Sequence, residues 1–236
     1  MRIYTWLTTL TLGFCSIVLA DLAPKTVNVG LSKAYIPAGF DDNDRVQFVV
    51  EGSFHNTCYK VGPWAFRLDA QNKQIIVQQQ AYVYPGICLQ MVVPFHQTID
   101  LGLVQQGSYA IVDAATHTKL GSIAINHTNN PEPDDYLYAP MSDAYVITDK
   151  DTGEHTLAIV GSFSDRCTDF DEIRVGYNDQ VIVVQPIVKH TENRFCEKIK
   201  TRFLKTVPLN KALTGMHLLH VRSMNGQAIN KMLDLP

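Results

Sequence analysis

The chain has 236 residues, and its 20 Lys and Arg against 23 Asp and Glu give a formal net charge of −3 at pH 7. This near balance, with no basic stripe along the chain, argues against a nucleic-acid partner, which would require clustered positive charge. The length is sufficient for two domains of about 100 residues each.

The first twenty residues predict a secretory signal peptide. Arg2 gives a weakly basic start, residues 7–19 are apolar or small apart from a few hydroxyls, and Val18-Leu19-Ala20 is a suitable cleavage-type ending before Asp21. The apolar stretch is shorter than the roughly 20 residues that a membrane-spanning helix needs. We therefore expect a mature chain from residue 21, secreted or periplasmic, without stable membrane insertion.

The remaining sequence contains two copies of one pattern, with matching landmarks 106 to 110 residues apart, which predicts a tandem duplication. The first copy has residues 32–36, 52–54, Cys58, 74–77, Cys88, Phe95, Thr98, Leu101 and Gly107. The second has residues 142–146, 161–163, Cys167, 180–183, Cys196, Phe203, Thr206, Leu209 and Gly215.

The four cysteines of the mature chain lie two per copy, at corresponding positions. Four cysteines allow three pairings, and only Cys58 with Cys88 and Cys167 with Cys196 makes both copies the same self-contained unit. Reduced, buried cysteines are one alternative. A zinc site with four cysteine ligands is another, but it usually needs closely spaced pairs such as C-x-x-C, which are absent. We predict two disulfides, which favours export.

The dominant hydrophobic period is two, in short runs bounded by Gly, Pro, Asn and Asp. Pro186 cannot donate to a sheet ladder, so its strand should lie at an edge or bulge there. The spacing predicts an all-β fold: two tandem Ig-like antiparallel β-sandwich domains. The matched strands are predicted at residues 45–54 and 155–163, 74–84 and 180–189, and 107–112 and 215–220.

The domain boundary is predicted where the composition becomes polar and rich in proline. We assign residues 21–128 to the first sandwich, 129–135 to a linker and 136–236 to the second sandwich. A standard immunoglobulin domain is not expected, because cysteines 29 or 30 residues apart are about half as far apart as its inter-sheet disulfide requires.

The order Gly52-Ser53-Phe54, Cys58, Cys88, Pro94-Phe95, Leu101 and Gly107-x-Tyr109 resembles small exported bacterial β-sandwich domains of unknown function. The second copy departs from that pattern with Arg202 before Phe203 and His217 at the tyrosine position. The resemblance implies a fold and bacterial export, and it transfers no catalytic residue.

No pattern of catalytic residues is present in the sequence. It lacks the G-x-S-x-G, H-E-x-x-H, P-loop and dinucleotide-binding motifs. His217 and His220 fall on one predicted strand, and their odd spacing places them on opposite faces. We therefore predict no catalytic residues, no cofactor and no enzymatic activity.

Two acidic groups are candidates for metal binding. Asp149-x-Asp151-x-Gly153 looks like the start of a calcium loop, but it lacks the later ligands, and a β-turn explains the same letters. Asp165, Asp169, Asp171 and Glu172 surround Cys167, and a solvated loop accounts for them.

Alternation along residues 76–84 places Gln78, Gln80, Tyr82 and Tyr84 on one face of a strand. Amides beside aromatic rings can bind sugars or peptides, and the same residues also form ordinary cross-strand pairs on an exposed sheet.

Three functions remain open. The first is a non-enzymatic exported protein that binds another protein or a glycan. The second is an inhibitor of a secreted protease, which would present the segment Tyr84-Pro85-Gly86-Ile87 beside Cys88. The third is a hydrolase with a composite site between the domains, which would need His and carboxylate side chains to meet there.

Overall fold

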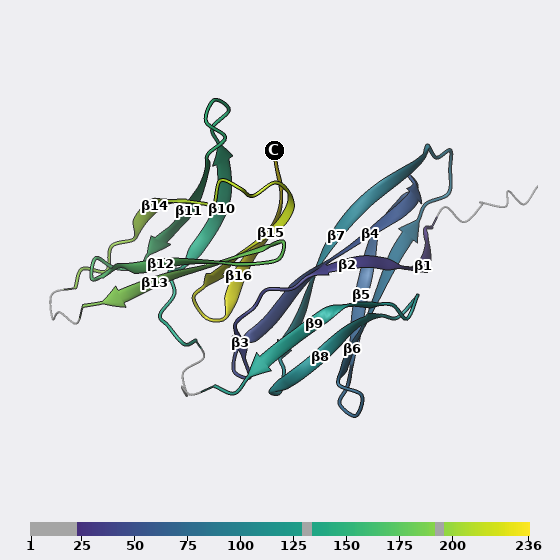
Figure 1. Ribbon diagram of the computed structural model, residues 1–236, viewed down its shortest axis with the longest axis horizontal. Coiled ribbons are helices and arrows are strands. Elements are labelled where there is room, and N and C mark those ends of the chain that lie inside the picture. The colour runs from purple at the N-terminus through teal and green to yellow at the C-terminus, as the bar shows by residue number, and fades with distance from the viewer. Residues whose placement is uncertain (1–22, 129–133, 192–195) are drawn as a thin grey trace, which may run out of the picture.

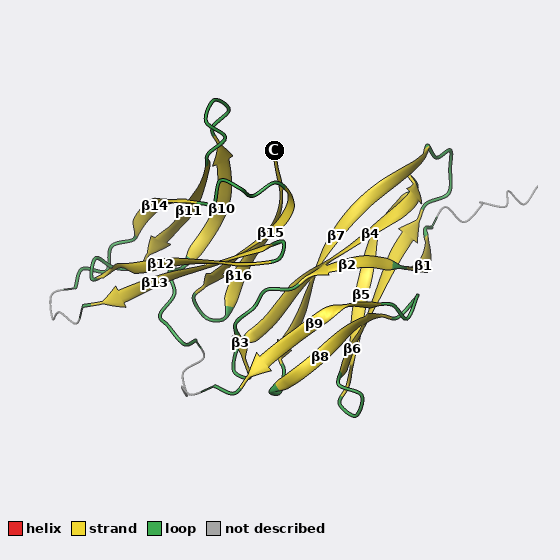
Figure 2. Ribbon diagram, viewed as in Figure 1, coloured by secondary structure: helices red, strands yellow, loops and turns green. Residues whose placement is uncertain are grey.

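The computed structural model describes residues 23–128, 134–191 and 196–236, and every regular element among them is a strand (Figure 2). The all-β prediction is therefore confirmed. The predicted signal peptide and most of the predicted linker lie outside the described residues. Within the described residues, no helix is long and apolar enough to cross a membrane.

The strands up to residue 126 form two sheets that face each other. The smaller sheet has the order β2-β4-β7, and the larger has the order β1-β6-β8-β9-β3, with β5 also paired to β6 (Figure 1). These strands are β1 (Lys25–Val29), β2 (Leu31–Tyr35), β3 (Phe40–Asp41), β4 (Arg45–Asn56), β5 (Tyr59–Asp69), β6 (Gln74–Val83), β7 (Gln90–Leu103), β8 (Gly107–Asp113) and β9 (Lys119–Asn126).

The strands from residue 141 onward form a second pair of sheets, ordered β10-β11-β14 and β12-β13-β15-β16. Apart from β1 and β3, their order repeats that of the first half, strand for strand. A common origin by duplication stays a prediction. These strands are β10 (Met141–Thr148), β11 (His155–Phe163), β12 (Thr168–Asn178), β13 (Val181–His190), β14 (Thr201–Pro208), β15 (Gly215–Ser223) and β16 (Gln227–Leu235).

Most strand pairs are antiparallel, as predicted, but β6 with β8, β13 with β15, and β3 with β9 are parallel. The first two parallel pairs follow from the chain path. After β6 the chain crosses to the other sheet as β7 and returns as β8 in the direction of β6, and β13, β14 and β15 repeat this crossover.

Pro186 lies beyond the part of β13 that pairs with β15, and the segment 137–139 takes the place of a neighbouring strand there. β15 pairs with β13 only over Val181–Val184, and beyond this the Pro186 carbonyl accepts a hydrogen bond from the Ala139 N–H (2.8 Å). Because N and C=O of one strand residue point to the same side, the proline nitrogen also points away from β12. The missing N–H therefore costs the β12–β13 ladder no bond.

Each half has its own hydrophobic core, because alternate residues of its strands point between its two sheets. Phe48, Ile75, Ile99 and Ile111 are wholly buried in the first core. Leu157, Ile159, Ile182 and Leu219 are wholly buried in the second core.

A third buried cluster joins the two halves. Tyr35 and Val49 of the first half pack with Val181 and Leu218 of the second. Leu218 and Leu219 are neighbours on β15 and belong to different clusters, so β15 is buried on both faces. The outer face of β15 is therefore covered by the first half.

Candidate functional site

Both predicted disulfides are present. Cys58 follows β4 and bonds to Cys88 between β6 and β7, with their Cα atoms 5.4 Å apart. Cys167 bonds to Cys196 in the corresponding place of the second half, with a Cα separation of 5.7 Å. Each disulfide joins two connections at one end of its sandwich.

The connection between β6 and β7 is fixed at that end by backbone as well as by sulfur. The Tyr84 N–H donates to the Cys58 carbonyl (3.0 Å), and the Thr57 N–H donates to the Leu89 carbonyl (3.2 Å). The Leu89 N–H in turn donates to the Thr57 hydroxyl (3.1 Å). The segment is thus bonded on both sides of Cys88.

This fixed segment exposes an unusual number of large apolar side chains. Ile87 is fully exposed, and Leu89 and Val92 keep 69% and 70% of their surface in solvent. Exposed apolar residues in a contiguous group commonly mark an interaction site. We call this group the apolar end: Tyr84, Ile87, Leu89, Met91 and Val92.

The apolar end lies on the part of the first half that points away from the second half (Figure 1). Its last two members open β7, an edge strand paired only with β4. The second half carries Glu197, Lys198, Ile199 and Lys200 in the equivalent stretch, so its own disulfide end is charged. The two ends are therefore not the same surface.

The predicted binding face on β6 is partly as expected. Gln78, Gln80 and Tyr82 alternate with buried neighbours, while Tyr84 lies beyond the end of the strand. The side-chain amides of both glutamines donate to the Asn28 carboxamide oxygen, at 2.9 and 3.2 Å. Part of their hydrogen-bonding capacity is thus used within the sheet.

The predicted metal residues Asp149 and Asp151 lie in the turn between β10 and β11. Asp149 Oδ1 accepts the backbone N–H groups of Asp151 and Thr152, both at 2.9 Å. These bonds lower the pKa of Asp149. The arrangement is the Asx-turn chemistry that the sequence offers as the alternative to a calcium loop.

Among the described residues, Asp165, Cys167 and Cys196 form the one group of potential metal ligands that lie close enough to share an ion. The two cysteines are bonded to each other, so they offer no thiolate to a metal.

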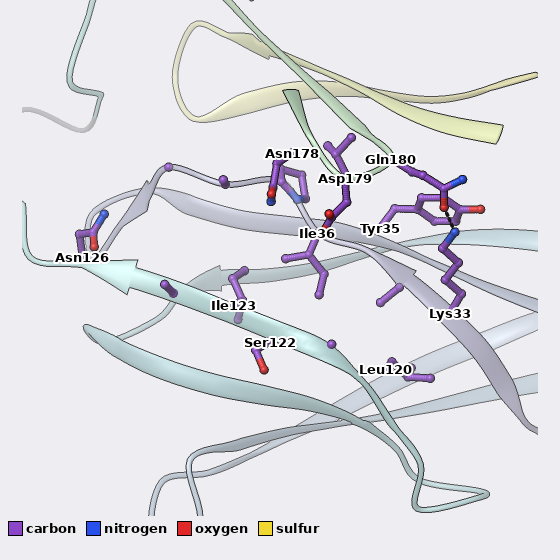
Figure 3. Close-up of a pocket in the computed structure, with 17 residues that line it drawn as sticks. Lys33, Tyr35, Ile36, Leu120, Ser122, Ile123, Asn126, Asn178, Asp179 and Gln180 are labelled. Carbon is purple, nitrogen blue, oxygen red and sulfur yellow. Dashed lines mark hydrogen bonds between the residues drawn. The ribbon is translucent and has the colours of Figure 1, made fainter. Parts of the chain in front are cut away.

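A pocket of about 380 Å³ lies between the two halves, lined by the β2–β3 connection, β9 and the turn before β13 (Figure 3). Lys33 reaches across it and donates to Gln180. Among the described residues that line the pocket, Asp179 supplies a carboxylate and none is a histidine. This pocket does not supply the His and carboxylate pair that the hydrolase hypothesis requires.

A buried ion pair also links the halves, and the sequence did not indicate it. Arg222 Nη1 lies 3.3 Å from Asp44 Oδ2, with both side chains almost fully buried. Arg222 also donates to the Gly39 carbonyl, and its guanidinium lies 5.3 Å from the centre of the Phe40 ring. The sequence signal for this pair is an arginine directly after the residues Leu218-Leu219-His220-Val221, and it does not indicate a partner.

Carboxylates crowd this ion pair. Burial raises the pKa of Asp44, and the charges of Asp134 and Asp135 add to the rise while Arg222 opposes it. Burial also raises the pKa of Asp134. The ion pair lies in the junction between the two halves. The cavity beside it has a volume of only about 20 Å³, which is too small for a ligand larger than a water molecule.

Comparison with known families bears on the first half. Residues 48–112 match the family model of the ORF11 beta-sandwich domain. The match runs from β4 to β8, and so includes the Cys58–Cys88 disulfide and the apolar end. It supports the β-sandwich assignment for less than a third of the chain.

No curated protein and no solved structure matches the chain significantly. Bacterial origin, export and an Ig-like relationship stay predictions from the sequence. The sequence analysis named part of the apolar end, because it proposed residues 84–87 as the segment that a protease inhibitor would present. The rest could have been recognised from residues 87–93, where apolar residues no longer alternate with polar ones.

Proposed function

We propose that the chain is an exported, non-enzymatic binding protein, and that its apolar end contacts another protein. The observation that carries the proposal is the fully exposed Ile87 beside Leu89, Met91 and Val92, held in place by the Cys58–Cys88 disulfide. Desolvated apolar anchors at the centre of a contact supply most of the energy of protein association.

Rigidity supports the same proposal. A segment already fixed by a disulfide and three backbone-anchored hydrogen bonds loses little conformational freedom on binding. The free edge of β7 adds unpaired backbone groups next to Met91 and Val92, which a partner strand could extend. A protein presenting an apolar pocket beside a strand edge fits this surface best.

Two features support export. Two disulfides form readily in oxidising compartments and rarely in the cytosol. The signal-like residues 1–20 predict the route. Both support a mature chain that is secreted or periplasmic.

The test is an affinity pull-down with the oxidised mature chain, residues 21–236, from secreted and envelope fractions of its source. Three baits are compared: wild type, the double variant Ile87→Asp/Leu89→Asp, and Ile199→Asp. Ile199 is the matched control, because it is also exposed and lies near the other disulfide.

We expect one stoichiometric partner that wild type and Ile199→Asp retain and the double variant loses. Reduction of the disulfides should also release it. Equal capture by all three baits would place the contact elsewhere. Binding of wild type to lipid vesicles, lost in the double variant, would replace the protein partner by a membrane surface.

Protease inhibition is the second candidate, and the exposed Ile87 favours it. A protease-binding loop must project one side chain from a rigid frame, as the segment before Cys88 does. Assays against secreted serine and cysteine proteases test this. Inhibition that Ile87→Asp abolishes would identify the partner as a protease, and cleavage after Tyr84 without inhibition would rule the candidate out.

A further inference from the structure

The second half contains a pocket at its disulfide end. The pocket has a volume of about 590 Å³, within the usual range of small-molecule sites. Its floor is apolar, and its rim is polar. The floor is formed by Leu137, Tyr138, Pro140, Phe163, Val188 and Met224.

The residue that follows the first cysteine differs between the two halves, and in the second half it lines this pocket. In the first half the Tyr59 ring, directly after Cys58, stacks on Phe54 with ring centres 5.5 Å apart. The corresponding residues after Cys167 are Thr168 and Phe163. In the second half the rings of Phe170 and Phe203 pack on Phe163, with centres 5.5 and 4.7 Å from its own, and Thr168, which has no ring, lines the pocket.

The hydroxyl groups at the rim are oriented by Asp165. Thr168 Oγ1 donates to Asp165 Oδ1 (3.0 Å), and Ser164 donates to Oδ2 (3.2 Å). Although burial alone would raise the pKa of Asp165, hydrogen bonds from the Cys167 N–H, Thr168 and Ser164 lower it. The Asp165 carboxylate is therefore ionised, and it already accepts hydrogen bonds from Ser164, Thr168 and the Cys167 N–H.

This arrangement fixes the histidine beside it. Thr168 has one hydroxyl proton, which goes to Asp165, so its oxygen accepts from His190 Nδ1–H at 2.9 Å. The second ring nitrogen of His190 has no hydrogen-bond partner among the described residues, so a ligand in the pocket could contact it.

Two cations complete the rim. Lys198 and Lys200 both line the pocket and are exposed, and neither forms an ion pair with the described residues. Both precede β14, which begins at Thr201. With Asp165 already satisfied, the rim presents a net positive charge to a ligand.

We propose that this pocket binds a small amphipathic anion, with its apolar body on Phe163 and its carboxylate or sulfonate group at Lys198 and Lys200. The shape and apolar floor admit a chain or ring system, and the charge of the rim selects a negative head group. The proposal concerns the second half and does not depend on the function proposed for the apolar end.

The test uses 8-anilinonaphthalene-1-sulfonate as the fluorescent probe and the oxidised chain, residues 21–236. Decanoate, decanol and decyltrimethylammonium are then compared as competitors below their aggregation concentrations. We expect displacement by decanoate, and at least tenfold weaker displacement by the neutral and cationic analogues.

Two variants assign the binding to this pocket. Thr168→Tyr places a ring at a residue that lines the pocket, and it should weaken probe binding at least tenfold. Lys198→Gln/Lys200→Gln, which leaves the floor intact, should weaken decanoate about tenfold and leave decanol unchanged. Lys189→Gln removes an exposed lysine of the same half that pairs with Asp171 outside the pocket, and it should bind as wild type.

Thermal melting checks that each variant is folded, and the lysine variant remains informative if Thr168→Tyr is not. Equal affinity of the lysine variant and wild type for decanoate would overturn the proposal. So would displacement of the probe by decanol as strongly as by decanoate.

Discussion

His220 shows how a buried side chain can make stability depend on pH. It lies on the face of β15 that meets the first half, with its ring 5.8 Å from that of Phe40. Its Nδ1 is 2.7 Å from the Asn230 carboxamide oxygen, and Asn230 donates to Gln47 across the junction at 2.9 Å. Because an amide oxygen only accepts, His220 Nδ1 carries the proton.

Burial lowers the pKa of His220 to about 4, the nearby charge of Arg222 adds to the effect, and the bond to Asn230 opposes it. The unfolded chain takes up this proton near pH 6.5, so folding loses stability as pH falls from 6.5 to 4. The shift corresponds to about 3 kcal/mol over that window. We expect His220→Gln to remove most of this dependence in urea unfolding at pH 7, 5.5 and 4.

The difference between wild type and variant is the relevant quantity. Asp44 and Asp134 have raised pKa values, so they gain protons on folding and stabilise the protein as pH falls through those values. This effect is common to both chains and cancels in the comparison. If the free energy of unfolding of His220→Gln changed with pH in parallel with that of wild type, His220 would take up its proton as readily in the folded protein as in the unfolded chain, which would contradict this prediction.

At the scale of single elements, a repeated glycine explains part of the sequence pattern. Gly52 of β4 faces the ring of Phe95 on β7, and Gly161 of β11 faces Phe203 on β14. A Cβ on Gly52 would come within 2.5 Å of the Phe95 ring, and one on Gly161 would meet both the Phe203 ring and the Pro140 carbonyl. The repeated G-S-F letters therefore mark aromatic rings lying across the strand.

Alanine at either glycine should destabilise the protein. Overpacking of this kind costs about 1–3 kcal/mol, so Gly52→Ala and Gly161→Ala should each lower the free energy of unfolding by that amount. Gly176→Ala is the matched control, because that strand glycine has open space around it. Urea titrations in which Gly161→Ala behaves like Gly176→Ala would contradict the packing account.

The sequence could predict the elements that repeat but not those that complete the sheets. The period of two and the paired landmarks indicated β4, β6, β8 and their counterparts. The short strand β3 carries two residues and no pattern, and β1 is recognisable only by its register against β6. The sequence analysis did not predict that β6 and β8 are parallel, because their direction depends on the chain crossing to the other sheet as β7. The alternation of apolar and polar residues within a strand does not indicate to which sheet the strand belongs.

At the scale of the whole molecule, the same limit applies to sites. The pocket of the second half gathers residues from β12, β13 and the stretch before β14, and no spacing in the sequence predicts that Lys198 lies near His190. The disulfides could be predicted because the repeated pattern of landmarks in the sequence reduced three pairings to one. The interface between halves could not, since it involves surfaces that the repeat pattern treats as exposed.

That interface gives the last prediction. Arg222 is the cation at the centre of the junction: it pairs with Asp44, lies 3.5 Å from the Tyr138 hydroxyl and packs on two aromatic rings. Removing one partner of a buried ion pair leaves the other charged and desolvated, which costs about 3–5 kcal/mol. We expect Arg222→Met to lower the free energy of unfolding by about that amount at pH 7.

Two further variants make this prediction specific to the buried pair. Arg166→Met removes an exposed arginine paired with Glu197, and it should change stability by less than about 1 kcal/mol. Arg222→Met/Asp44→Asn removes both charges, so it should recover part of the loss, because no uncompensated carboxylate remains in the junction. If the double variant were as unstable as the sum of the two single variants, the charges would act independently, and Arg222 would join the halves by packing alone.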